Sequence, residues 1–265
     1  MTKMKFLLAA SLTLTLAACG GSDKADTKPV KAPTQTSAPV QAEKPTPKPE
    51  PKKVVASTPA ENAAPPPKPL SGKRLYMRRS CMACHGKNGA RGIQEYPNIA
   101  GLDAIYMRAQ IRDILSGKRK GSADALTGAP RAESMHGALV TPEGEARITA
   151  DEIKIVSAWL SEQTPAGPQV HEPALSAERI AAGKAGYEKA KCKTCHGVDG
   201  NKPNKGYPHL AGQKSAYLLA QLKDIRNKDR TNSRSKMMTS FVSKLSDEQM
   251  AEIADYLSQI NPNAQ

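Results

Sequence analysis

Two short motifs in the chain combine cysteine and histidine at the same spacing. The first reads CMACH at residues 81–85, and the second reads CKTCH at residues 192–196. Two cysteines three positions apart on one helical turn can each form a thioether to a porphyrin, and the histidine that follows can bind its iron axially. The motifs therefore predict two covalently bound c-type haems, with thioethers from Cys81, Cys84, Cys192 and Cys195 and with His85 and His196 as iron ligands.

Other uses of paired cysteines fit these motifs less well. A zinc ribbon places its second CxxC about 15–20 residues from the first, whereas here the second pair follows 111 positions later. A thioredoxin-like pair needs a βαβ setting, and a disulfide framework would explain neither histidine. The fifth cysteine, Cys19, belongs to a different signal.

The first eighteen residues are typical of an export signal. Lys3 and Lys5 precede an apolar run, residues 6–18, that is too short for a transmembrane helix. The end of the run, LAAC at residues 16–19, resembles a bacterial lipoprotein box, which implies cleavage before Cys19 and its acylation. An ordinary secretory signal is the alternative, and both place the protein in the periplasm. An Asp directly after the lipidated cysteine resembles an inner-membrane retention signal. Gly20 and Gly21 stand there instead, which favours the outer membrane.

Residues 19–69 predict a disordered, lipid-anchored tether. This stretch is rich in Pro, Lys and Ala and has no sustained apolar period, so it cannot bury enough surface to offset its ordering entropy. The chain has a formal charge of +14, and about +9 falls on the part that should fold. Such a basic surface favours redox partners with acidic patches. We expect no nucleic-acid partner and no small-molecule substrate, and we expect a monomer.

The two motifs lie in a longer internal repeat. Residues 72–113 align with residues 183–224 at a constant offset of 111, and the offset is 97 where residues 148–160 align with residues 245–257. The first copy therefore has 14 extra residues between these blocks. We predict one domain at residues 70–162, a linker at 163–175 and a second domain at 176–265.

Each copy predicts three helices and almost no strand, so the fold class is all-α. The first helices are expected at about residues 71–79 and 176–191, and the middle helices around 105–111 and 216–222. Capping-box pairs, Thr149 with Glu152 and Ser246 with Gln249, should start the last helices. Two units this small lack the apolar core to fold alone, so the haems should complete it.

At this level of detail the chain resembles a dihaem class I cytochrome c of the cytochrome c4 family over about residues 71–261. The resemblance implies that a glycine and an aromatic residue of the first helix cross the last helix; the matching pairs are Gly72 with Tyr76 and Gly183 with Tyr187. It also implies that a proline carbonyl accepts the second ring N–H of each iron-binding histidine, a role that falls to Pro97 and Pro208. Such a contact would fix the orientation and basicity of the imidazole.

The resemblance implies a methionine as the sixth iron ligand, on the segment before each last helix. In the second domain Met238 fits the spacing and Met237 is the alternative. In the first domain we expect Met135, and His136 would instead give bis-histidine ligation. His171 and His209 look like surface residues.

Two six-coordinate His/Met irons would leave no open site for a substrate, and neither copy contains a paired carboxylate, a Ser/His/Asp set or a phosphate-binding loop. We therefore expect no catalytic residue and no enzymatic activity. The resemblance implies a periplasmic electron carrier between a quinol-oxidising complex or dehydrogenase and a terminal oxidase or reductase of a respiratory chain. A cytochrome subunit of a flavoprotein dehydrogenase and a dihaem peroxidase are the alternatives.

Overall fold

The computed structural model describes residues 70–124 and 128–264. The expected signal peptide and tether, including Cys19, lie outside these residues. Within them the regular elements are helices, and β pairing is confined to two isolated bridges, Ala123–Pro130 and Val140–Ala146. The all-α prediction is confirmed. None of the helices in this part of the chain is long and apolar enough to cross a membrane.

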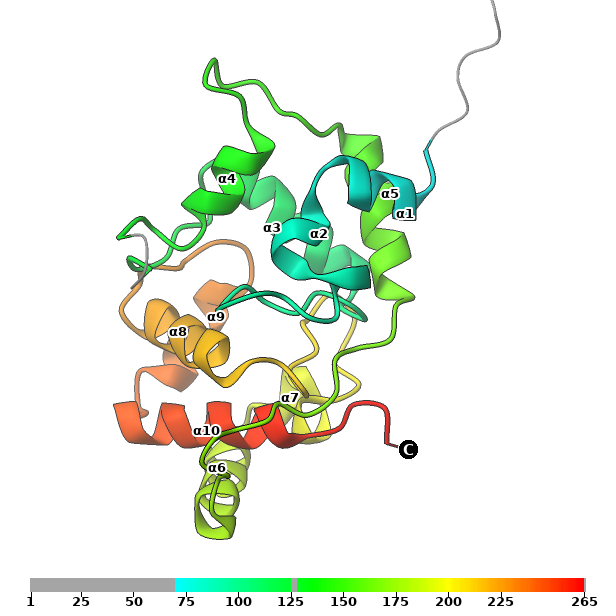
Figure 1. The fold of residues 1–265 in the computed structure, drawn as a ribbon. Coiled ribbons are helices and arrows are strands. Elements are labelled where there is room, and N and C mark those ends of the chain that lie inside the picture. The colour runs from blue at the N-terminus through cyan, green and yellow to red at the C-terminus, as the bar shows by residue number, and fades with distance from the viewer. Residues whose placement is uncertain (1–69, 125–127, 265) are drawn as a thin grey trace, which may run out of the picture. The chain divides into compact units, whose positions relative to one another are not determined.

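The helices form two lobes with the same order of elements (Figure 1). The first lobe contains α1 (Gly72–Arg78), α2 (Cys81–His85), the 3₁₀ turn η1 (Lys87–Gly89), α3 (Ala104–Leu115), α4 (Glu133–Leu139) and α5 (Ala150–Ser161). The second lobe contains α6 (Ala177–Lys189), α7 (Lys193–His196), η2 (Val198–Gly200), α8 (Ser215–Arg226), α9 (Ser235–Val242) and α10 (Asp247–Gln259).

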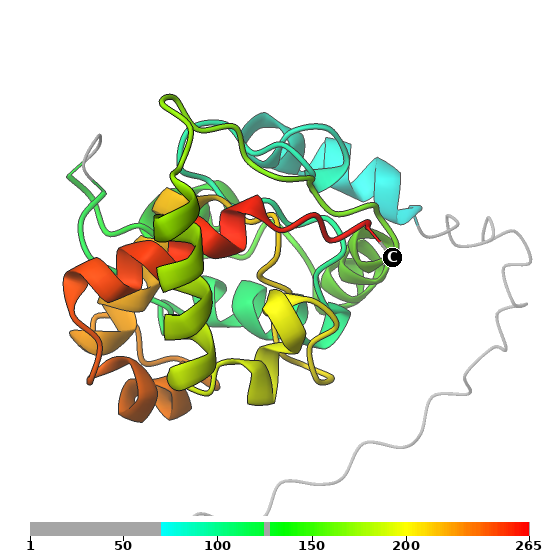
Figure 2. The same ribbon diagram turned by 90° about the horizontal axis from the view of Figure 1, so that it is seen from below.

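In each lobe the first helix crosses the last one at close range. A Cβ added to Gly72 of α1 would lie 2.1 Å from Trp159 Cβ of α5, and one added to Gly183 of α6 would lie 2.1 Å from the Glu252 carbonyl oxygen of α10. Figure 2 shows α6 lying across α10. The glycines are therefore required by the approach of the two helices, as the resemblance implied.

Apolar residues from the crossing helices form the core of each lobe. Tyr76 is 1% exposed and its ring centroid lies 5.3 Å from that of Trp159, while Tyr187 pairs with Tyr256 at 6.2 Å. The last helices begin as predicted, because both capping boxes are present. The hydroxyl of Thr149 accepts from the N–H of Glu152, and Ser246 does the same for Gln249.

Each lobe has two more α-helices than the three expected, namely a short helix at the CxxCH motif, α2 or α7, and the helix before the last one, α4 or α9. α4 and α9 occupy the segments that the sequence placed in loops, and they are the helices that carry the candidate methionines. Met135 in α4 and Met238 in α9 align at an offset of 103. The 14 extra residues of the first lobe are thus divided into eight before α4 and six after it.

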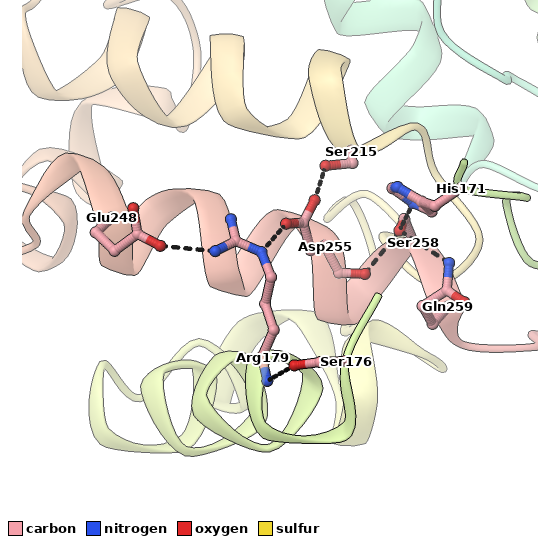
Figure 3. A network of polar contacts seen from close by, with 8 residues as sticks. All are labelled: His171, Ser176, Arg179, Ser215, Glu248, Asp255, Ser258 and Gln259. Carbon is pink, nitrogen blue, oxygen red and sulfur yellow. Dashed lines mark hydrogen bonds and ion pairs between the residues drawn. The ribbon is translucent and has the colours of Figure 1, made fainter. Parts of the chain in front are cut away.

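The segment that joins the lobes is attached to the second lobe. The N–H of Gln169 donates to the Ser258 carbonyl at 2.8 Å, and His171 Nε2 lies 2.9 Å from Ser258 Oγ. Arg179 of α6 pairs with Asp255 and Glu248 of α10 at 2.5 and 2.6 Å (Figure 3). Because these contacts hold the segment on α10, His171 is not a free surface residue.

Candidate functional site

The first CxxCH motif forms the short helix α2, and the second forms α7 with Cys192 at its N-cap. The histidine of each motif is buried, with 7% of His85 and 5% of His196 exposed. The four cysteines of the motifs are half-buried, and none of them forms a disulfide. Burial raises the pKa of Cys81 and of Cys192 to about 11. A redox-active CxxC pair requires a lowered thiol pKa, so this environment does not fit dithiol catalysis.

The backbone conformation after each motif requires a glycine. Gly86 has φ +71° and Gly197 has φ +78°, and a Cβ on either would lie within about 2 Å of a backbone carbonyl across the loop. Their own carbonyls accept hydrogen bonds from the core tyrosines, Tyr76 Oη at 2.6 Å and Tyr187 Oη at 2.8 Å. The end of each motif is therefore bonded directly to the crossing helices.

Each motif histidine is oriented by a proline carbonyl. His85 Nδ1 lies 2.9 Å from the Pro97 oxygen, and His196 Nδ1 lies 3.0 Å from the Pro208 oxygen. A carbonyl can only accept, so Nδ1 carries the hydrogen and the lone pair is on Nε2. Burial lowers the pKa of both imidazoles and the carbonyl contacts oppose this shift. The hydrogen bonds expected at Pro97 and Pro208 are thus present, and both rings are suited to bind a metal through Nε2.

A cavity of about 420 Å³ extends between the two histidines. His85 and His196 both line it, and so do apolar residues of the middle helices α3 and α8, among them Ile111, Ile114, Leu218 and Leu222. No three His, Cys, Asp or Glu side chains come together as a metal site in the described part of the chain. A large apolar cavity lined by two buried, oriented imidazoles fits haem iron, in which the porphyrin supplies the other nitrogens.

The cavity distinguishes the candidate sixth ligands. Met135 and Met238 both line it. His136 does not, and its Nδ1 lies 2.8 Å from the Ile114 carbonyl of α3. Met237 is 58% exposed and is not among the residues that line the cavity. Met107, which we interpreted as a core residue, is 5% exposed within the core cluster of the first lobe.

His209 differs from its expected surface position. It is partly buried, lines the cavity, and its Nε2 has no hydrogen-bond partner among the described residues. Burial lowers its pKa. The prediction failed because the residue follows Pro208, and the loop that carries this proline carbonyl to His196 also turns His209 inwards.

Sequence reasoning also missed two arginines of the cavity wall, Arg119 and Arg230. Each follows a middle helix, and the two are related by the same offset of 111 as the haem motifs. Extending the repeat by six residues beyond Asp113 would have identified the pair.

These features define a class of protein, the c-type cytochromes, with two haem-binding lobes. Comparison with known proteins agrees: the cytochrome c family matches residues 70–164 and 180–261. The chain belongs to this family, as a member of its two-haem cytochrome c4 group. It therefore contains two covalently bound c-type haems and transfers electrons.

Relatives and solved structures extend over both lobes. Cytochrome c4 of Azotobacter vinelandii is 30% identical over 67% of this chain and 82% of its own length. The thiosulfate dehydrogenase electron acceptor of Thiomonas intermedia is 28% identical over 76% of this chain and 84% of its own length. The structure of cytochrome c4 from Acidithiobacillus ferrooxidans aligns with a TM-score of 0.53 and 26% identity, covering 68% of this chain and 98% of that one.

Proposed function

We propose that the protein is a periplasmic electron carrier that accepts electrons from a membrane donor, a quinol-oxidising complex or dehydrogenase, and passes them to a terminal oxidase or reductase. The observation that carries this proposal is the shared cavity, because it provides one histidine and one methionine for each of two irons. With both axial positions filled by the protein, a haem exchanges electrons without binding a substrate. We therefore infer that the protein is not itself an enzyme.

The proposal assigns a role to each of these residues, which the geometry supports. Cys81 and Cys84 would attach the first haem and Cys192 and Cys195 the second. His85 with Met135, and His196 with Met238, would be the axial ligands, while Pro97 and Pro208 orient the histidines. Methionine, a soft neutral ligand, favours ferrous iron and raises the reduction potential. His136 is the poorer candidate because its ring contacts the end of α3.

The N-terminal segment supports a membrane-attached carrier. We propose that residues 1–18 are removed, that Cys19 is lipidated, and that residues 19–69 form a tether, with the outer membrane as the favoured site. Pro-rich chains extend about 3.1 Å per residue where polyproline conformation persists. Such a tether would let the two lobes move between partners fixed in or on a membrane.

One relative favours a second candidate function, which also consists of electron transfer through the two haems. Because the match in Thiomonas intermedia is named a thiosulfate dehydrogenase electron acceptor, this chain could serve one dehydrogenase as a dedicated acceptor subunit. The two candidates differ in the lifetime of the complex and not in the site.

The test uses the holoprotein with both haems attached. The dithionite-reduced protein should bind no carbon monoxide, should show no turnover with hydrogen peroxide, and should be reoxidised by membranes that contain a terminal oxidase. It should also migrate as a monomer after purification from its native host. Carbon monoxide binding or peroxide turnover at wild-type haems would refute the carrier, and stable co-purification with a dehydrogenase would instead support the acceptor subunit.

A further inference from the structure

Two large apolar side chains of α9 are exposed to solvent. Met237 is 58% exposed and Phe241 is 47% exposed. They are four positions apart, so they lie on the same face of the helix. Among the large apolar side chains exposed in the described part of the chain, these two alone share a helix face. Adjoining exposed apolar residues of this kind mark an interaction surface more often than scattered ones do.

The inner face of the same helix belongs to the haem cavity. Ser235 and Val242 are buried, and Met238 between them lines the cavity. These positions recur with the helical period, so α9 has one face that delivers the candidate iron ligand and one that packs against nothing in the lobe core. Because a helix is about 10–12 Å across, a protein bound to the outer face would lie roughly one helix diameter from the cavity.

Lysines surround this apolar pair. Lys236 and Lys244 are exposed at the two ends of α9. Lys205 is also exposed, and its carbonyl accepts a hydrogen bond from Arg234 Nη1 at 3.1 Å, which brings its loop to the start of the helix. None of the three lysines forms an ion pair with another described residue. Residues 230–246 contain four basic residues and no acidic one, so the apolar pair lies in a positively charged surface.

The first lobe has no such surface on its equivalent helix. At the offset of 103, α4 carries Ser134 and Ala138 in place of the apolar pair, and Glu133 in place of the lysine at the start of the helix. The equivalent segment, residues 119–149, contains four basic and four acidic residues. Delivery of a methionine to the cavity therefore requires neither the exposed apolar pair nor the excess positive charge, and both are specific to the second lobe.

Charge selects the kind of molecule that fits this surface. A second copy of the chain has the same formal charge of +14, and residues 19–69 contain eight lysines against five carboxylates, so both would be repelled. A protein with an apolar centre and an acidic rim is complementary to it. We propose that the outer face of α9, with Lys205, Lys236 and Lys244, is the docking surface for an acidic redox protein, which exchanges electrons with the second haem. This inference rests on the proposed carrier function and names the chemistry of the partner.

The apolar part of the surface is tested by giving α9 the residues of α4. The double variant Met237→Ser/Phe241→Ala is compared with Met77→Ser/Val170→Ala, which removes two apolar residues that are 49% and 81% exposed elsewhere. The reduced holoprotein is reoxidised by native membranes that contain a terminal oxidase, and the initial rate is measured against cytochrome concentration. We expect the half-saturating concentration to rise at least about fivefold in the double variant. The control should match the wild type, and all spectra should show two attached haems.

The charged part of the surface is tested independently by Lys236→Glu, with Lys184→Glu on the exposed face of α6 as the control. Both variants change the net charge equally, so a difference between them reports the position of the charge. We expect Lys236→Glu to lower the reoxidation rate at low cytochrome concentration about threefold or more. This loss should shrink at high ionic strength because exposed charges are screened.

Reoxidation of the wild type with no difference between the surface variants and their controls would overturn the docking surface and leave the carrier function intact. A wild type that the membranes do not reoxidise would refute the carrier function, and the docking surface with it. Two further measurements identify other occupants. Sedimentation with phosphatidylglycerol vesicles that only the double variant loses would assign the surface to anionic lipid, and a dimer that only the double variant dissociates would assign it to a second copy. Either result would overturn the proposal.

Discussion

The two lobes are nearly identical on the histidine side of the cavity and different on the methionine side. The His85–Pro97 and His196–Pro208 contacts differ by 0.1 Å, and the tyrosine contacts to Gly86 and Gly197 by 0.2 Å. By contrast, the segment between the middle and last helices is 14 residues longer in the first lobe. The CxxCH geometry allows little variation, whereas a methionine can be delivered by segments of different length.

The helices that carry the candidate methionines, α4 and α9, contact the loop that follows the CxxCH motif in each lobe. Equivalent arginines make these contacts, but with different partners. Arg131, before α4, forms an ion pair with Glu95 at 2.7 Å. Arg234, before α9, aligns with Arg131 and stacks on the Tyr207 ring at 4.6 Å. The first lobe also holds α4 through His136 and the Ile114 carbonyl. One lobe thus uses charge where the other uses an aromatic ring.

The largest expected effect comes from the methionines themselves. Met135→Ala and Met238→Ala should each leave both haems attached and open one of the two irons to carbon monoxide, because the other methionine of the cavity lining, Met107, is packed in the core cluster of the first lobe. The matched controls are the neighbours, His136→Ala and Met237→Ala, which should leave the wild-type spectrum. A carbon monoxide complex in a neighbour variant, and none in the methionine variant, would reassign that ligand.

The helix crossings should give the next effect. Gly183→Val forces a side chain into a backbone carbonyl of α10, and Gly72→Val into Trp159, so each should lower the free energy of unfolding by about 3 kcal/mol or more. Denaturant titration of the holoprotein measures this. Gly137→Ala is the control: the glycine lies within α4 with open space around it, and alanine should be neutral or stabilise by up to about 1 kcal/mol. Equal stability of all three variants would contradict the crossings.

Substitution of Arg131 or Arg234 should have a smaller effect on the free energy of unfolding, and its salt dependence should differ between the two lobes. Arg131→Ala and Arg234→Ala should each cost about 0.5–1 kcal/mol. The cost of Arg131→Ala should shrink at high salt because its ion pair is exposed and screened, while that of Arg234→Ala should change less. Unfolding measured at low and high ionic strength tests the contrast, and an identical salt response of the two variants would argue against it.

The smallest effect concerns the capping boxes, which use Glu152 in the first lobe and Gln249 in the second. Burial opposes ionisation of Glu152, but the Thr149 N–H and Arg79 lower its pKa below the ordinary 4.5. A lowered pKa in the folded state stabilises the protein above about pH 4.5, and this contribution is lost as the pH falls through the folded value. Glu152→Gln should therefore cost about 0.5 kcal/mol at neutral pH and nothing in acid. A constant difference across this range would exclude the linkage.

Much of the histidine side could be predicted from sequence because short-range spacing determines it. The CxxCH motifs, the prolines twelve residues later and the capping boxes each act over a few turns of chain. The methionine helices α4 and α9 were missed because they have only seven and eight residues, which is too short for a helical period to be read. The repeat could have identified Arg119 and Arg230, but their hydrogen-bond partners in the other lobe lie 98–124 positions away, and only the tertiary structure shows them.

Each lobe should supply its iron with one histidine and one methionine. The most direct test is the near-infrared spectrum of the oxidised holoprotein, in which the weak sulfur-to-iron band is measured per haem. We expect two low-spin His/Met irons per chain. A single such iron beside a bis-histidine or high-spin centre would contradict it.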